Sequence, residues 1–101
     1  MVVRWHKTAM NDLKEFFEVT KLNNPKDYIQ QLISYVNNLS EQPNLGKIYL
    51  YIHGFIIRQL IYKDHKIFYY NDNENNQINV LSVVHYRQDI KKKINYIKKY
   101  L

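Results

Sequence analysis

The first forty residues change from an extended to a helical pattern of apolar positions. Residues 2–5 are β-branched or aromatic apart from one arginine, as in a short strand. In each of the next two stretches, mainly apolar residues recur at helical spacing and would form one face of a helix. They are Ala9, Met10, Leu13, Phe16, Phe17 and Thr20 in the first stretch, and Tyr28, Ile29, Leu32, Ile33, Val36 and Leu39 in the second. Thr8 is placed to cap the first helix, and Asn24 to cap the second, which has Pro25 in its first turn. The pattern predicts an antiparallel helical hairpin that ends near Ser40.

The middle of the chain, after Gly46, consists of short runs rich in Ile, Tyr, Phe and Leu. These runs predict strands at Lys47–His53, Phe55–Lys63, His65–Tyr70 and Gln77–Val84. Gly54 and the Lys63-Asp64 pair are expected to form turns, and the polar residues 71–76 a hairpin loop. Because connections this short cannot make a parallel crossover, the four strands are expected to form an antiparallel meander.

Residues 90–101 return to helical spacing. The apolar positions are Ile90, Ile94, Ile97 and Leu101, and the lysines Lys91, Lys92, Lys93, Lys98 and Lys99 fall largely elsewhere on the turn. We expect this basic amphipathic helix to dock on its own domain. The order β-α-α-β-β-β-α therefore predicts one α+β domain over residues 1–101, a twisted antiparallel sheet with the helical hairpin packed on one face. The other face is expected to stay partly open and to carry polar and cationic side chains.

Fifteen Lys and Arg against nine Asp and Glu give a net charge of +6 and a pI near 9.5. Such a surface attracts RNA, DNA, the ribosome or an acidic protein, although a solvated basic surface accounts equally well for the charge alone. The lack of cysteine excludes disulfides, thiolate chemistry and Cys-based zinc sites, and fits a reducing cytosol. No apolar run is long enough for a signal peptide or a transmembrane helix, so we expect a cytoplasmic protein with no membrane partner.

Few catalytic motifs are compatible with this chain. It has no Gly-rich phosphate loop, nucleophile elbow or pair of carboxylates at catalytic spacing. His6 and His53 lack metal-ligand spacing, so neither a metal nor a cofactor is expected. His65 falls at a predicted turn and is expected to be exposed. The strand tyrosines are expected in the core or at its rim rather than as base-stacking platforms, namely Tyr49, Tyr51, Tyr62, Tyr69 and Tyr70.

Four segments resemble the RelE/ParE toxin superfamily, in the order in which that family has them. They are LSEQPNLGK at residues 39–47, IRQL at 57–60, HKIFY at 65–69 and VLSVVHYRQD at 80–89. The opening, from Trp5 through Ala9 to Asp12-Leu13, is also similar to the family's usual start. Each segment consists of common residues, but their order and spacing agree with the layout inferred from periodicity. The resemblance therefore covers nearly the whole chain.

This resemblance implies the toxin of a type II toxin–antitoxin pair, held inactive by a cognate antitoxin, commonly in a heterotetramer. Two mechanisms occur on the one fold, and fold alone does not choose between them. RelE-like members enter the ribosome and cut mRNA without a metal, and this endoribonuclease function is our first hypothesis. ParE-like members poison DNA gyrase without cleaving RNA, which is the alternative. A degenerate relative that only binds its antitoxin is the third.

The resemblance also implies site residues for RNA cleavage, which needs a proton-transfer group and cations around the phosphate. The catalytic set would be Arg58, Lys66 and Arg87 for the phosphate charge, His85 for proton transfer and Tyr86 for stacking or donation, with Lys47 and Lys63 holding RNA. Two of these residues have structural alternatives. His85 is equally suited to a hydrogen bond inside the fold, and Arg58 to an ion pair with Asp64 or Glu74.

Three features depart from the nuclease pattern. The His85-Tyr86 pair resembles the terminal pair of YoeB-like ribosome-dependent nucleases, but here fifteen residues follow it. Lys66 stands where many RNA-cleaving relatives have an arginine. A regular strand through residue 87 would place His85 and Tyr86 on opposite faces, so they share a site only if the strand ends or bulges near Val84.

Overall fold

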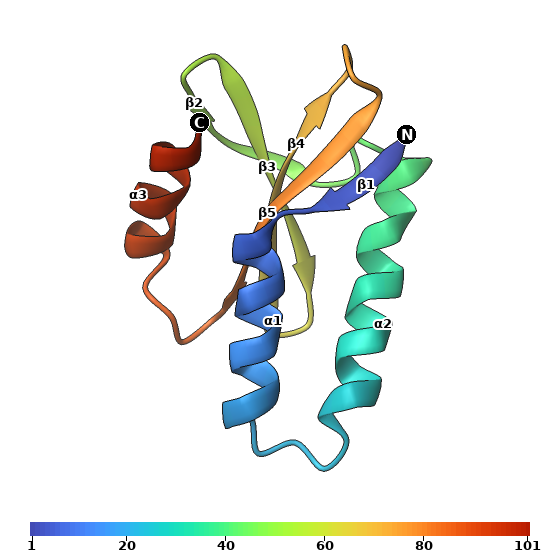
Figure 1. Cartoon of the computed structure of the whole chain (residues 1–101), viewed down its shortest axis with the longest axis vertical. Helices are drawn as coiled ribbons and strands as arrows, with labels where there is room; N and C mark the ends of the chain where they lie inside the picture. Colours follow the sequence, from blue (N-terminus) through green and yellow to red (C-terminus); the bar gives the residue numbers. More distant parts are fainter.

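The elements of the computed structural model, which describes residues 1–101, follow the predicted order (Figure 1). The strands are β1 (Val2–Trp5), β2 (Lys47–Ile52), β3 (Phe55–Tyr62), β4 (His65–Asp72) and β5 (Gln77–His85). The helices are α1 (Lys7–Val19), α2 (Pro25–Asn37) and α3 (Ile90–Tyr100), with a 3₁₀ turn at Asn38–Ser40 that extends α2. The predicted α+β order is confirmed. None of the helices is long and apolar enough to cross a membrane.

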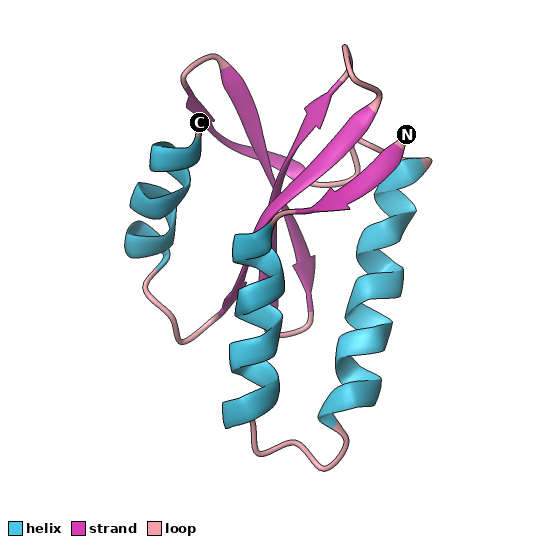
Figure 2. Cartoon of the chain, in the orientation of Figure 1, coloured by secondary structure: helices cyan, strands magenta, loops and turns pink.

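All five strands belong to one sheet, in the order β1-β5-β4-β3-β2 (Figure 2). Strands β2 to β5 pair antiparallel in chain order, as the short connections predicted. Strand β1 adds to the far side of β5 in parallel, from Val2 opposite Gln77 to Trp5 opposite Val80, a pair that the sequence pattern did not indicate. Because β1 stops at Val80, the second half of β5 has a free edge. The register of β5 against β4 shifts at Leu81, which has no partner on β4.

Each face of the sheet has its own apolar core, so the molecule has three layers. The hairpin of α1 and α2 covers one face with a core of Ala9, Leu13, Leu32, Val36, Leu39, Leu60, Ile67, Tyr69, Ile78, Val80 and Val83. Helix α3, at the left of Figure 1, packs on the other face through Ile94 and Ile97, against Ile52, Ile57, Phe68, Leu81 and Val84. The expected docking of the C-terminal helix is confirmed. The face expected to be open is therefore covered in part by α3, and Ile61 and Lys66 lie on its uncovered side.

The predicted N-terminal cap is confirmed for α2 and wrong for α1. Asn24 caps α2 as predicted, because its Oδ1 accepts the N–H of Asp27 at 3.3 Å. Helix α1 already begins at Lys7, so Thr8 lies inside its first turn and no side chain caps it. The predicted Thr8 cap is wrong because the strand pairing continues into His6, whose N–H donates to the Val80 carbonyl, and the helix follows at once.

Candidate functional site at the end of β5

Strand β5 ends at His85, and the chain turns back immediately after it. The N–H of Tyr86 donates to the Asp64 carbonyl at 2.9 Å, and the N–H of Gln88 closes a turn onto the His85 carbonyl at 2.9 Å. The rings of His85 and Tyr86 therefore lie together, with centroids 4.5 Å apart, and Arg87 Nε donates to the Tyr86 hydroxyl at 2.9 Å. The strand end thus brings His85, Tyr86 and Arg87 to one place.

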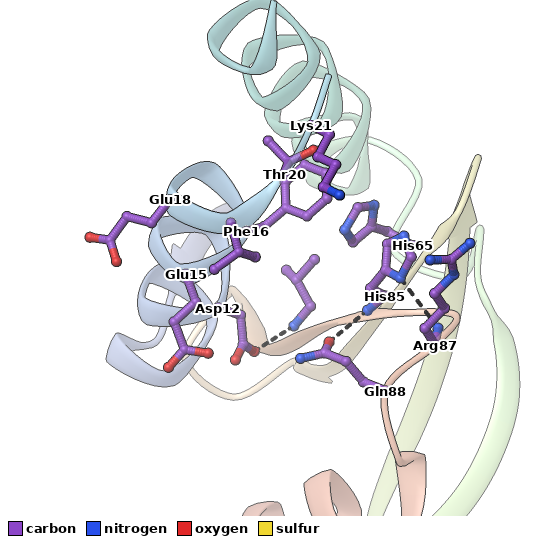
Figure 3. Close-up of a pocket in the computed structure, with 12 residues that line it drawn as sticks. Asp12, Glu15, Phe16, Glu18, Thr20, Lys21, His65, His85, Arg87 and Gln88 are labelled. Atoms are coloured by element: carbon purple, nitrogen blue, oxygen red, sulfur yellow. Dashed lines mark hydrogen bonds between the residues drawn. The ribbon is translucent and has the colours of Figure 1, made fainter. Parts of the chain in front are cut away.

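A cavity of about 530 Å³ lies between the second half of α1 and this strand end (Figure 3). The helix side is formed by Asp12, Glu15, Phe16, Glu18 and Val19 together with Thr20 and Lys21, and the sheet side by His65, Val83, His85, Arg87 and Gln88. Its lining includes the cations Lys21 and Arg87 as well as Glu15 and Glu18, whose carboxylates point outward from α1 (Figure 3). The site is therefore mixed in charge rather than a uniformly cationic phosphate groove.

His65 is the residue of this site that sequence reasoning missed. The predicted start of a strand at His65 is confirmed, because it is the first residue of β4, but its expected exposure is wrong, because it is only 2% exposed. Its ring lies 5.1 Å from that of His85, its register partner on β5, and its Nδ1 is 2.8 Å from the Tyr28 hydroxyl. Burial first, and then the charge of His85, lower the pKa of His65 to about 4, so the ring is neutral at pH 7. Alternation with Ile67 and Tyr69 was the available signal, because it places His65 on the hairpin face.

The hydrogen bonds of His85 limit its chemistry. The ring Nδ1 of His85 accepts the backbone N–H of Arg87 at 3.2 Å, and the backbone N–H of His85 donates to Gln88 Oε1 at 2.8 Å. A neutral ring whose Nδ1 accepts carries its proton on Nε2. In this arrangement His85 offers an N–H donor to the cavity, and Nδ1 would have to give up the Arg87 bond before it could act as a base.

A buried carboxylate fixes the wall behind the cavity. Asp12 of α1 accepts the N–H of Val83 at 2.9 Å and the hydroxyl of Ser82 at 2.8 Å, on the edge of β5 that β1 leaves free. Its second oxygen forms an ion pair with Lys93 of α3. Both carboxylate oxygens of Asp12 therefore have structural partners within the protein.

Arg58 lies in the middle of β3, away from His85 at the end of β5. It points to the hairpin face like His85, but it pairs with Tyr69, four residues along β4 from His65, or roughly 13 Å of strand. Its Nη1 donates to the Gly46 carbonyl at 2.7 Å, and it forms no ion pair with Asp64 or Glu74. The structure uses Arg58 to hold the loop before β2.

The three predicted lysines do not converge with His85 either. Lys66 alternates with His65 and Ile67 and therefore points to the face that carries α3. Lys63 lies over the rings of Tyr28 and Tyr62, 5.6 and 5.5 Å from their centroids, and Lys47 begins the edge strand β2. Nor do three His, Asp or Glu side chains gather anywhere as a metal-binding group.

Comparison with known proteins identifies the family. The profile of the family described as "ParE toxin of type II toxin-antitoxin system, parDE" matches residues 3–90. The chain belongs to this ParE toxin family. The match confirms the resemblance to the RelE/ParE superfamily that the four segments indicated. No match is found among curated proteins.

Two solved structures resemble this ParE-family chain. A chain of the RelBE2 toxin–antitoxin complex of Mycobacterium tuberculosis is 24% identical with a TM-score of 0.63, over 83% of this chain and 95% of that one. The isolated E. coli RelE toxin is 16% identical with a TM-score of 0.57, over 99% of this chain and 98% of that one. At these identities the likeness is one of fold.

Proposed function

We propose that this ParE-family toxin acts by binding its target, DNA gyrase, and not by cutting RNA. One observation carries the proposal: the groups that RNA cleavage would need lie at separate places. Arg58, in the middle of β3, is bonded to Gly46, His85 lies at the end of β5, and Lys66 points to the opposite face. Metal-free cleavage requires the base and the cations within hydrogen-bond reach of one phosphate.

The hydrogen bond of His85 and the charge of its cavity support the same proposal. Its Nδ1 accepts the N–H of Arg87, so this nitrogen is not free to act as a base. Glu15 and Glu18 on the cavity wall would repel an RNA phosphate. The family match supports the ParE-like alternative as well, because it is to a profile described by the parDE pair.

A cognate antitoxin is part of this proposal. The family is that of type II toxin–antitoxin pairs, and one structural relative was solved in a toxin–antitoxin complex. We propose that an antitoxin holds the chain inactive, in an assembly with two copies of each partner. Co-expression with the neighbouring antitoxin gene, followed by measurement of the mass of the purified complex, tests the partner and the stoichiometry together.

The second candidate, a ribosome-dependent nuclease, is favoured by one observation. His65 and His85 lie 5.1 Å apart, beside Arg87 and Lys21, in one cavity. Two neighbouring histidines, one of them with a pKa lowered by burial, can serve as an acid and base pair. This arrangement would assign cleavage to the end of β5 and would leave Arg58 and Lys66 without a catalytic role.

Brief induction in cells without antitoxin separates the two candidates. Messenger RNA 5′ ends and gyrase-linked DNA breaks are measured together, with His85→Asn as the test variant and His53→Asn, in an exposed turn, as its control. We expect intact messages and DNA breaks. In-frame cuts within translated messages that persist in His53→Asn and vanish in His85→Asn, while the protein stays folded, would refute the proposal.

A further inference from the structure

The positive charge of this molecule is concentrated in one helix. Residues 90–101 contain five lysines and no acidic residue. Of the fifteen Lys and Arg, ten therefore remain in residues 1–89 against all nine Asp and Glu, so that this part has a net charge of only +1. The excess charge of the chain is a local property of α3.

Packing fixes which side of α3 faces outward. Ile94 and Ile97 are buried against the sheet, and Lys93 is held in the ion pair with Asp12. The remaining lysines are exposed, namely Lys91, Lys92, Lys98 and Lys99. Lys98 lies seven residues after Lys91, and Lys99 seven residues after Lys92, which is about two helical turns or about 10.5 Å along the axis. The four free ammonium groups therefore form a stripe on a helix that is already anchored.

Two tyrosines lie beside this stripe, next to the Lys92–Lys99 row. Tyr96 and Tyr100 are both exposed, their rings are 5.1 Å apart, and their hydroxyls share a hydrogen bond of 2.8 Å. A groove of about 320 Å³ separates α3 from α1, with Lys92, Lys93 and Tyr96 on its α3 side and Thr8, Asn11, Asp12 and Glu15 on its α1 side. Tyrosine hydroxyls such as those on α3 are frequent hydrogen-bond donors to phosphate and sugar.

We propose that the outward surface of α3 binds the sugar–phosphate backbone of a nucleic acid. Exposed lysines and aromatic rings without intervening carboxylates suit this ligand, since such interfaces are polar and strongly cationic. The carboxylate of Glu15 lies on the α1 side of the groove, so the backbone lies over α3 and not over α1. This inference depends neither on the target proposed above nor on the cavity at the end of β5.

Two other occupants fit the surface less well. A membrane would need the apolar stripe of α3, but that stripe is buried in the domain. A protein partner would need apolar side chains at the centre of the contact, and the exposed large apolar side chains of α3 are only Tyr96 and Tyr100. The lysines of α3 instead complement the charge of regularly spaced phosphates, which favours a nucleic-acid backbone over both alternatives.

The salt dependence of binding tests the proposal on the full-length chain. The probes are a duplex DNA of twenty base pairs, a single-stranded RNA of the same length, and polyglutamate. Four backbone contacts predict that log K falls with log[salt] with a slope of about −3.6 for duplex DNA, or about −2.8 for single-stranded RNA. The probe that binds more tightly at one salt concentration identifies the nucleic acid.

The variant K92Q/K99Q should reduce the duplex slope by about 1.8 in magnitude and weaken binding at every salt concentration. The control K14Q/K26Q removes the same charge from exposed positions on α1 and α2 and should leave the slope unchanged. Equal slopes in the two variants would overturn the proposal. So would tighter binding of polyglutamate than of either nucleic acid, which would assign the surface to an acidic protein.

Discussion

Asp12 is the residue that ties the three layers together. It lies on α1, bonds the free edge of β5 through Ser82 and Val83, and pairs with Lys93 on α3. It is 8% exposed, so its charge is stabilised by these partners and hardly by water. The same carboxylate therefore sets the position of the cavity wall and the docking of the basic helix.

Replacement of Asp12 should be costly for this reason. Asp12→Ala leaves the Val83 N–H unpaired and Lys93 without its counter-ion, and we expect the free energy of unfolding to fall by about 3 kcal/mol. Urea denaturation measures this change. Glu15→Ala, three residues along the same helix and exposed, is the control and should stay within about 0.5 kcal/mol of the unchanged protein.

His65 makes the stability of the protein dependent on pH. Its ordinary pKa of 6.5 applies to the unfolded chain, whereas in the folded protein burial lowers it to about 4. Between these values the unfolded state binds more protons, so stability falls as the pH is lowered from 6.5 towards 4. The loss is at most about 3 kcal/mol. His65→Gln should flatten this part of the curve of unfolding free energy against pH, and an unchanged curve would contradict the burial of a neutral ring.

Residue-scale features were the hardest to predict from the sequence. No role for Asp12 was predicted, because its partners are about 70 and 80 positions away in the chain. His65 was assigned to a turn from its neighbours Lys63 and Asp64, although the alternation of β4 already placed it on a buried face. Long-range pairing leaves no local signal, whereas alternation does.

At the scale of elements, periodicity was sufficient. Strands and helices have a strong period over their whole length, so each was predicted within a few residues. The parallel pairing of β1 with β5 was not predicted, because it depends on which sheet edge remains free once the meander has formed. The turn before β2 is explained by packing: a Cβ at Gly46 would lie 2.8 Å from the Gln59 carbonyl and from the Tyr69 ring.

The docking of α3 rests on few side chains and can be tested through one of them. Ile97 is 2% exposed in the second core, so Ile97→Ala should lower the free energy of unfolding by about 2–4 kcal/mol. Asn95→Ala, on the exposed side of the same helix, should change it by less than about 0.5 kcal/mol. Thermal and urea unfolding measure both variants. If Ile97→Ala and Asn95→Ala changed the free energy of unfolding equally, α3 would not pack on the sheet.

At the scale of the whole molecule, the two layers of helices divide the predicted site. The sequence placed His85, Arg58 and Lys66 on neighbouring strands, and alternation along β4 already separates Lys66 from the face of His65, but the pattern did not show how far Arg58 would lie from His85. That separation depends on the strand register, including the bulge at Leu81, and on the end of β5 at His85, and neither leaves a clear mark in the sequence. The fold was therefore predictable, while the convergence of the site was not.

The proposal that this toxin binds gyrase and does not cleave RNA can be tested with the purified chain. It is added to ribosomes translating a defined message and, in parallel, to gyrase supercoiling a plasmid. We expect a full-length message, inhibited supercoiling and accumulated covalent gyrase–DNA complexes. Ribosome-dependent cuts that disappear in His85→Asn, together with normal supercoiling, would contradict this proposal.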